Sequence, residues 1–150
     1  MKYFLLLNKT PILKWGNIPD EIYFEGDLPK GYNLAISPSK PYIVLDIDIH
    51  DKINGFLNIP KDIYKELENN HFSYSSKGEG KHFWIKYIGS KELLNKTSGK
   101  GFDLRTDKGY VVWNHYLYKD IRECLHLIQE SSNKLNNFLE LNFAKNEKMG

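Results

Sequence analysis

Residues 41–50 read Pro-Tyr-Ile-Val-Leu-Asp-Ile-Asp-Ile-His, the most strand-like stretch of the chain. Alternate side chains of a strand share a face, which divides this stretch into two sets. One set is entirely apolar: Ile43, Leu45, Ile47 and Ile49. The other set is Val44, Asp46, Asp48 and His50. The stretch therefore predicts a strand over 42–49 that carries two carboxylates on one face.

These two carboxylates lie about 7 Å apart, given a rise of ~3.3 Å per residue along a strand. Like charges at that separation repel each other, and a divalent cation held between them removes the repulsion. The pair therefore predicts a metal site with Asp46 and Asp48 as ligands. The alternative is a solvent-facing strand edge that happens to carry two charges.

A second strand is predicted over 81–88, after the glycine-rich loop Lys77-Gly78-Glu79-Gly80, in a hairpin with residues 72–75. His82, Trp84 and Lys86 share one face of it, and His82 stands at the loop exit. Small residues let backbone N–H groups approach an anion, and His82 can donate to a phosphate there. A purely structural histidine is the alternative.

A third strand, Gly101–Arg105, alternates in the same way. Phe102 and Leu104 are predicted to face inward, and Asp103 and Arg105 to lie together on the other face. A carboxylate beside a guanidinium is either an ion pair or a third metal ligand next to a phosphate clamp. Sequence alone leaves both interpretations open.

The remaining pattern mixes strands and helices, which predicts an α+β fold. We expect strands over 3–7 and 32–36, a helix from Pro60 to about Asn69, and a helical turn over 91–95. The strand 101–105 is expected to pair with 109–113 through the turn at 106–109. After Lys119 the apolar period becomes helical, with Ser131 or Ser132 capping the last helix. Residues 1–150 are expected to form a single domain, with a core over about 10–115 and helices over about 117–145.

Composition narrows the class of protein. The 150 residues are 41% hydrophobic, enough for one packed domain. Cys124 is the only cysteine, which excludes an internal disulfide and a zinc site built on several thiolates. No apolar run approaches the ~18 residues of a membrane span, so no membrane association and a cytoplasmic location are expected.

The basic residues are concentrated in one segment. Residues 77–108 hold 8 Lys and Arg against 4 Asp and Glu, whereas residues 1–76 hold 8 against 10. Such an excess suits a polyanionic ligand, and a solvated lysine-rich face is the alternative.

Three motifs follow one another along the chain: Leu45-Asp46-Ile47-Asp48, then Ser75-Ser76-Lys77-Gly78-Glu79-Gly80-Lys81-His82-Phe83-Trp84, then Gly101-Phe102-Asp103-Leu104-Arg105. In this order they resemble the archaeo-eukaryotic primase superfamily, in particular the primase–polymerase domains of phages, plasmids and mobile elements. Gly109-Tyr110-Val111-Val112 also resembles a strand common in these domains, so the resemblance spans about residues 10–115. The family's frequent Ser-x-His is here Gly80-Lys81-His82, and Trp113-Asn114-His115 stands where many relatives have Pro-Pro-Ser.

The resemblance implies nucleotidyl transfer with Mg²⁺ or Mn²⁺ in a small RNA-recognition-like sheet with helices on one side. It implies that Asp46, Asp48 and Asp103 are the catalytic metal ligands. It further implies a triphosphate pocket, formed by His82, Lys81, Arg105, Ser75 and Lys77. The implied partners are a DNA template and primer, nucleoside triphosphates, and a helicase or helical accessory domain.

Two other classes of function, one enzymatic and one non-enzymatic, remain on sequence grounds. Strands ending in Asp-x-Asp also occur in haloacid-dehalogenase-like phosphatases and metal-dependent glycosyltransferases. The former usually place that strand near the N-terminus, whereas about forty residues precede it here. A primase-like fold can also act as a nucleotide- or DNA-binding replication accessory without turnover.

Overall fold

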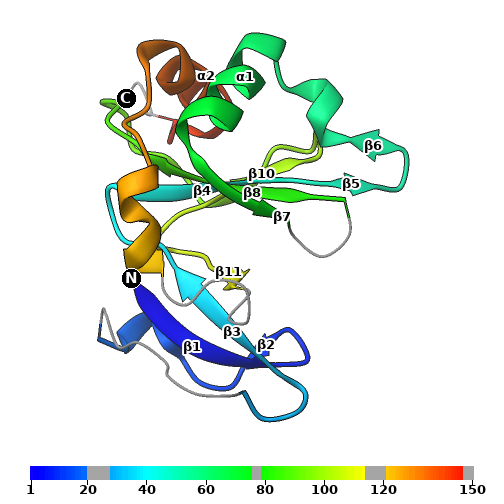
Figure 1. The fold of residues 1–150 in the computed structure, drawn as a ribbon, viewed down its shortest axis with the longest axis vertical. Coiled ribbons are helices and arrows are strands. Elements are labelled where there is room, and N and C mark those ends of the chain that lie inside the picture. Colours follow the sequence, from blue (N-terminus) through cyan, green and yellow to red (C-terminus); the bar gives the residue numbers. More distant parts are fainter. Residues whose placement is uncertain (20–27, 76–78, 114–120, 147–150) are drawn as a thin grey trace.

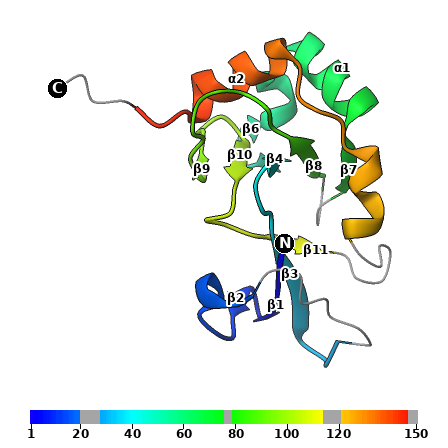
Figure 2. The same ribbon diagram turned by 90° about the vertical axis from the view of Figure 1, so that its left-hand side faces the viewer.

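The computed structural model of the chain describes residues 1–19, 28–75, 79–113 and 121–146. It is built in three layers, which Figures 1 and 2 show from two sides. Helices α1 (Lys61–Asn70) and α2 (Asn133–Phe143) cover one face of a five-stranded sheet. The other face of that sheet packs against a four-stranded sheet. The predicted α+β class is confirmed.

The five-stranded sheet has the order β7-β8-β4-β10-β9, and its neighbouring strands are antiparallel. Its strands are β4 (Tyr42–Ile47), β7 (Phe72–Ser75), β8 (Lys81–Lys86), β9 (Lys96–Thr97) and β10 (Phe102–Arg105). The predicted hairpin of β7 and β8 is confirmed, and so is the central strand up to Ile47. In chain order β4, α1, β7 and β8 form one unit, in which β8 lies between β7 and β4.

The four-stranded sheet has the order β11-β3-β1-β2. Its strands are β1 (Lys2–Leu7), β2 (Thr10–Pro11), β3 (Tyr32–Ser37) and β11 (Val111–Trp113). The prediction that residues 101–105 pair with 109–113 is wrong. β10 pairs with β4 and β9, whereas β11 crosses to the other sheet and pairs with β3. There the Val111 and Trp113 side chains are buried between the sheets, and this burial of apolar surface stabilises the pairing with β3.

The helix-side core joins the apolar face of the five-stranded sheet to the stripes of both helices. The predicted face of β4 is confirmed, because Ile43, Leu45 and Ile47 are all buried in this core. Ser132 caps α2 as predicted, since its hydroxyl accepts a hydrogen bond from the Leu135 N–H at 3.1 Å.

The expected helical turn over 91–95 is wrong. Leu93 makes an isolated bridge with Ala144, and the Leu94 N–H donates to the Phe143 carbonyl at 2.8 Å. The segment is therefore extended along the end of α2. The first of the two expected C-terminal helices is a 3-10 helix, η3 (Ile121–Leu127).

The second core lies between the two sheets and is rich in aromatic side chains. Trp84 and Trp113 are both buried there, with their ring centroids 6.2 Å apart in an edge-to-face contact. Val44 of β4 is buried in the same core, on the face that also carries Asp46. The carboxylate face of β4 is thus covered in its middle and becomes accessible toward its C-terminal end.

In the part of the chain that the structure describes, no helix is both long enough and apolar enough to span a bilayer.

Candidate functional site

Ionisable and hydroxyl-bearing side chains form one row across the five-stranded sheet. The strand register places His82 of β8 opposite Asp46 of β4, and Asp46 opposite Asp103 of β10. The row continues to Tyr74 of β7 on one side and to Thr97 of β9 on the other. Directly opposed residues on neighbouring strands have Cβ atoms about 4.5–5.5 Å apart, so these side chains interact.

A hydrogen bond and an ion pair link one half of this row. The Tyr74 hydroxyl lies 2.9 Å from Nδ1 of His82, and Nε2 of His82 lies 3.3 Å from Oδ1 of Asp46. The His82 side chain is only 9% exposed, whereas the Asp46 side chain is 22% exposed. Both ring nitrogens of His82 therefore face protein groups, and Asp46 is the member of this set that reaches solvent.

The other half of the row is an acidic pair beside a guanidinium. Asp103 faces Asp46 across the strands, and its Oδ2 lies 3.5 Å from Nη2 of Arg105. Burial raises the pKa of the Asp103 carboxyl above its ordinary value, against the opposing charge of Arg105. The negative charges of Asp46 and Asp48 raise this pKa further. The site thus concentrates negative charge on partly buried groups.

Asp48 lies just beyond the end of β4. Its Oδ1 accepts a hydrogen bond from the Ile49 N–H at 2.8 Å, and its Oδ2 lies 4.0 Å from Nδ1 of His50. Both side chains are about half exposed, at 51% and 52%. The strand predicted over 42–49 therefore breaks at Asp48, and Ile49–His50 forms the separate short strand β5, paired with β6 (Ile53–Asn54).

Two glycines hold the backbone of Asp48 in place. The Asp48 N–H donates to the Gly101 carbonyl, and the Gly55 N–H donates to the Asp48 carbonyl, each at 2.9 Å. A Cβ atom on Gly55 would lie 2.0 Å from the Gly101 oxygen, so a side chain does not fit there. Gly101 also has φ +88°, a conformation that favours glycine. Sequence reasoning did not identify this contact, because it joins residues far apart in the chain.

The predicted phosphate-binding residues are only partly brought together. Arg105 lies in the site beside Asp103. Lys81 does not, because it lies on the helix-covered face, where its Nζ is 3.7 Å from Glu68 and 6.0 Å from the centre of the Phe83 ring. Ser75 is opposite Lys81 in the hairpin register, and Lys77 lies outside the described residues.

Tyr74 and Thr97 are the members of the row that sequence reasoning missed, and Tyr74 is the one that contacts His82. Tyr74 lies opposite His82 in the register of the β7–β8 hairpin. A loop shorter by one residue would move every facing pair along the strand. The alternation of β7 was visible in the sequence, but its register with β8 was not.

The carboxylates fit a divalent cation only in part. Within 1–19, 28–75, 79–113 and 121–146, no group of three or more His, Cys, Asp or Glu side chains is arranged to hold a metal ion. Asp46 and Asp103 do face each other, with one oxygen of each engaged by His82 or Arg105. Hard cations such as Mg²⁺ take carboxylate oxygens and keep several waters, so two facing carboxylates suit them.

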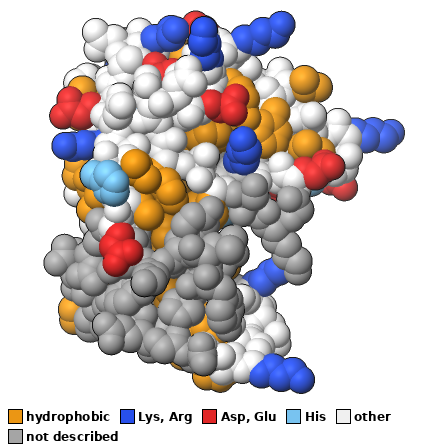
Figure 3. Space-filling view, viewed as in Figure 1, with side chains coloured by type: hydrophobic (Ala, Val, Ile, Leu, Met, Phe, Trp, Pro, Cys, Tyr) orange, Lys and Arg blue, Asp and Glu red, His pale blue; other side chains and the backbone are white. Residues whose placement is uncertain are grey.

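Part of the basic segment is paired with acidic side chains. Lys86 pairs with Glu130 at 3.8 Å, and Lys81 and Arg105 pair with acidic side chains as described above. Figure 3 shows the same pattern on one face, where basic side chains stand among acidic and apolar ones.

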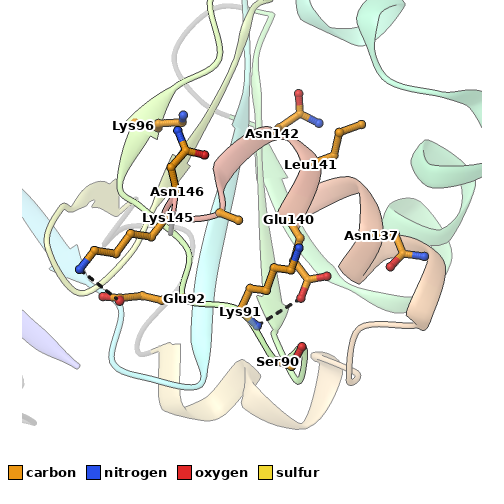
Figure 4. Close-up of a pocket in the computed structure, with 11 residues that line it drawn as sticks. Ser90, Lys91, Glu92, Lys96, Asn137, Glu140, Leu141, Asn142, Lys145 and Asn146 are labelled. Carbon is orange, nitrogen blue, oxygen red and sulfur yellow. Dashed lines mark hydrogen bonds and ion pairs between the residues drawn. The ribbon is translucent and has the colours of Figure 1, made fainter. Parts of the chain in front are cut away.

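A surface cavity of about 630 Å³ lies on the other side of the sheet, between α2 and the segment 90–96 (Figure 4). Its charged side chains are largely engaged with neighbours. Lys145 pairs with Glu92 at 3.8 Å, and Glu140 accepts a hydrogen bond from the Lys91 N–H at 3.2 Å. None of the row residues lines it. The row across the sheet, with its opposed carboxylates, is therefore the better candidate site.

Comparison with models of known protein families and with curated proteins gives no match for this chain. Function is therefore inferred from the geometry of the row.

Proposed function

We propose that this chain is a metal-dependent nucleotidyltransferase, the catalytic domain of a DNA primase–polymerase that adds nucleotides to the 3′ end of a template-bound primer. The observation that carries the proposal is the opposition of Asp46 and Asp103 on neighbouring strands, with Arg105 beside them. The unit β4-α1-β7-β8, with β8 between β7 and β4, also supports a small RNA-recognition-like sheet, because this order is that of split β-α-β folds.

In this proposal Asp46 and Asp103 hold Mg²⁺ or Mn²⁺, with Asp48 as the third carboxylate. The bound cations supply activation of the primer 3′-oxygen and neutralisation of the leaving pyrophosphate. Arg105 donates hydrogen bonds to the nucleotide phosphates, a role that suits its planar guanidinium.

The electrostatics of the row support cation binding. Burial and two neighbouring carboxylates raise the pKa of Asp103, which means that its ionised form is disfavoured in the protein alone. A divalent cation reverses this preference, because it adds two positive charges next to the carboxylates. The rigid central strands then keep the carboxylates aligned during the reaction.

The proposal is tested by extension of a labelled primer on a DNA template, with Mg²⁺ or Mn²⁺ present. We expect metal-dependent extension that is lost in the double variant Asp46→Ala/Asp48→Ala, which should still bind DNA. Asp62→Asn is the matched control, because Asp62 is an exposed carboxylate on α1 that pairs with Lys134. DNA binding should fall steeply with salt if phosphates are contacted. Extension by the double variant at the wild-type rate would refute the proposal.

The alternative is a non-catalytic replication accessory that binds nucleotide or DNA. It is favoured by one observation, the engagement of the Asp48 carboxylate with the neighbouring Ile49 N–H rather than with the row. Metal-dependent nucleotide binding without primer extension would select this alternative.

We expect a supplied primer to be extended faster than any unprimed synthesis, because a primer holds the first nucleotide by stacking.

A further inference from the structure

We propose that Tyr74 and His82 are positioning residues of the carboxylate site, in which the Tyr74 hydroxyl holds the His82 ring and the ring holds Asp46. His82 is then not a ligand of the nucleotide phosphates. This inference rests on the proposed function, since it concerns the same metal-binding carboxylates.

Both ring nitrogens of His82 are already engaged by protein groups. Nδ1 of His82 lies 2.9 Å from the Tyr74 hydroxyl, and Nε2 lies 3.3 Å from Oδ1 of Asp46. A histidine that donates to a phosphate needs one nitrogen directed at the ligand. The His82 side chain is only 9% exposed, so its ring would have to leave both Tyr74 and Asp46 to reach a phosphate.

Tyr74 is itself held in place by contacts with the second sheet. Its hydroxyl donates to the Val112 carbonyl at 3.2 Å, and the residue is 5% exposed. Its ring makes edge contacts with Trp113 and with His82, at centroid distances of 5.1 and 5.0 Å. Val112 and Trp113 belong to β11 of the other sheet, so Tyr74 connects Asp46 to the core between the sheets.

The chemistry of the three side chains fixes which of them donates in each contact. An ionised carboxylate only accepts, so Nε2 of His82 must carry the proton that faces Asp46. The Tyr74 hydroxyl has one proton, and it donates this proton to the Val112 carbonyl. It therefore accepts from Nδ1, so in this arrangement both ring nitrogens of His82 carry protons. Oδ1 of Asp46 is thereby held, while Oδ2 accepts no hydrogen bond from the residues that the structure describes. Oδ2 is the oxygen left for a cation.

Groups that orient a metal ligand in this way typically change metal affinity about 10–100-fold when they are removed. The test measures Mn²⁺ affinity of the full chain by electron paramagnetic resonance, in the absence of nucleotide. We expect Tyr74→Phe to weaken Mn²⁺ binding about tenfold. Tyr64→Phe is the matched control. Tyr64 belongs to α1 and packs against Phe83 of β8, on the face of that strand opposite His82, at a ring-centroid distance of 5.9 Å.

Two substitutions of His82 separate positioning from loss of packing. His82→Gln keeps an amide N–H near the Nε2 position and should retain most of the Mn²⁺ affinity. His82→Asn keeps a polar group only near the Nδ1 position and should lose it. Ring ¹⁵N spectra of the wild type should show His82 protonated at Nε2, and Tyr74→Phe should shift its Nδ1 resonance.

ATP binding measured without divalent ions tests the alternative, in which His82 contacts the phosphates directly. We expect His82→Gln and Tyr74→Phe to leave metal-free ATP affinity unchanged. A His82 variant that loses metal-free ATP binding but keeps Mn²⁺ affinity would overturn the inference, and so would an unprotonated Nε2. Wild-type primer extension with Mn²⁺ affinity insensitive to Tyr74→Phe would overturn this inference alone. A wild type that neither binds Mn²⁺ nor extends primers would overturn both proposals.

Discussion

Asp103→Asn should leave the stability of the protein nearly unchanged without metal and should make it less stable than the wild type when a divalent cation is added. Without metal, the substitution removes a like charge opposite Asp46, a gain of about 0.2–1 kcal/mol. It also removes the ion pair with Arg105, in which both side chains are about 30% exposed, a loss of about 0–1 kcal/mol. The two terms nearly cancel, so the variant should lie within about 1 kcal/mol of the wild type.

The dependence on pH has a defined sign. The folded-state pKa of Asp103 is raised above its ordinary value of 3.8, so ionisation of this group disfavours the native state. Its contribution to stability is therefore present in acid and is lost as the pH rises from 3.8 through the raised value. In Asp103→Asn no carboxyl ionises at this position, so the variant does not lose stability in this way as the pH rises. Any stability that the variant gains over the wild type is therefore largest at neutral pH.

With metal present, only the wild type should gain thermal stability. At a free Mn²⁺ concentration of 100 times Kd, binding to the native state alone stabilises it by about 2.7 kcal/mol. For a domain of this size about 1 kcal/mol corresponds to a shift of about 2–4 °C, so the expected rise in Tm is about 5–11 °C.

The assay is thermal unfolding at neutral pH, in EDTA and in a Mn²⁺ series, for wild type, Asp103→Asn and the control Asp62→Asn. Equal Mn²⁺ stabilisation of wild type and Asp103→Asn would refute the assignment of Asp103 as a ligand. A loss of more than about 2 kcal/mol in EDTA would refute the electrostatic reasoning, because it exceeds the ion-pair term.

Two further predictions concern the scaffold. Gly55→Ala would bring a Cβ to 2.0 Å from the Gly101 carbonyl oxygen and should destabilise the protein by about 1–3 kcal/mol or more, measured by urea unfolding. Gly16→Ala, with nothing within 4 Å of the added Cβ, should stay within about 0.5 kcal/mol of wild type, and equal effects of the two would contradict the predicted clash. Burial lowers the pKa of His71 below its ordinary 6.5, despite the hydrogen bond to Glu66, so wild-type stability should fall as the pH drops below about 6.5. His71→Leu should flatten this dependence between about pH 7 and 5 in thermal unfolding, and an unchanged slope would show that another group titrates.

The sequence by itself determined which side of each element faces a core. Period-two alternation places Leu45 and Leu104 on the helix side, and Asp46 and Asp103 on the other side, as observed. The α2 stripe and its Ser132 cap were equally readable. These features depend on neighbours within a few residues, where backbone geometry alone decides direction. The same alternation sends Lys81 to the face opposite His82, so its absence from the site was also implicit in the sequence.

Only the tertiary structure decided which strands became neighbours and in what register. It paired β11 with β3 rather than β10, set Tyr74 opposite His82, and held Asp48 beyond the strand end through the contact of Gly55 with Gly101. Strand order and register arise because segments distant in sequence bury their apolar faces against one another, and no local pattern records that choice.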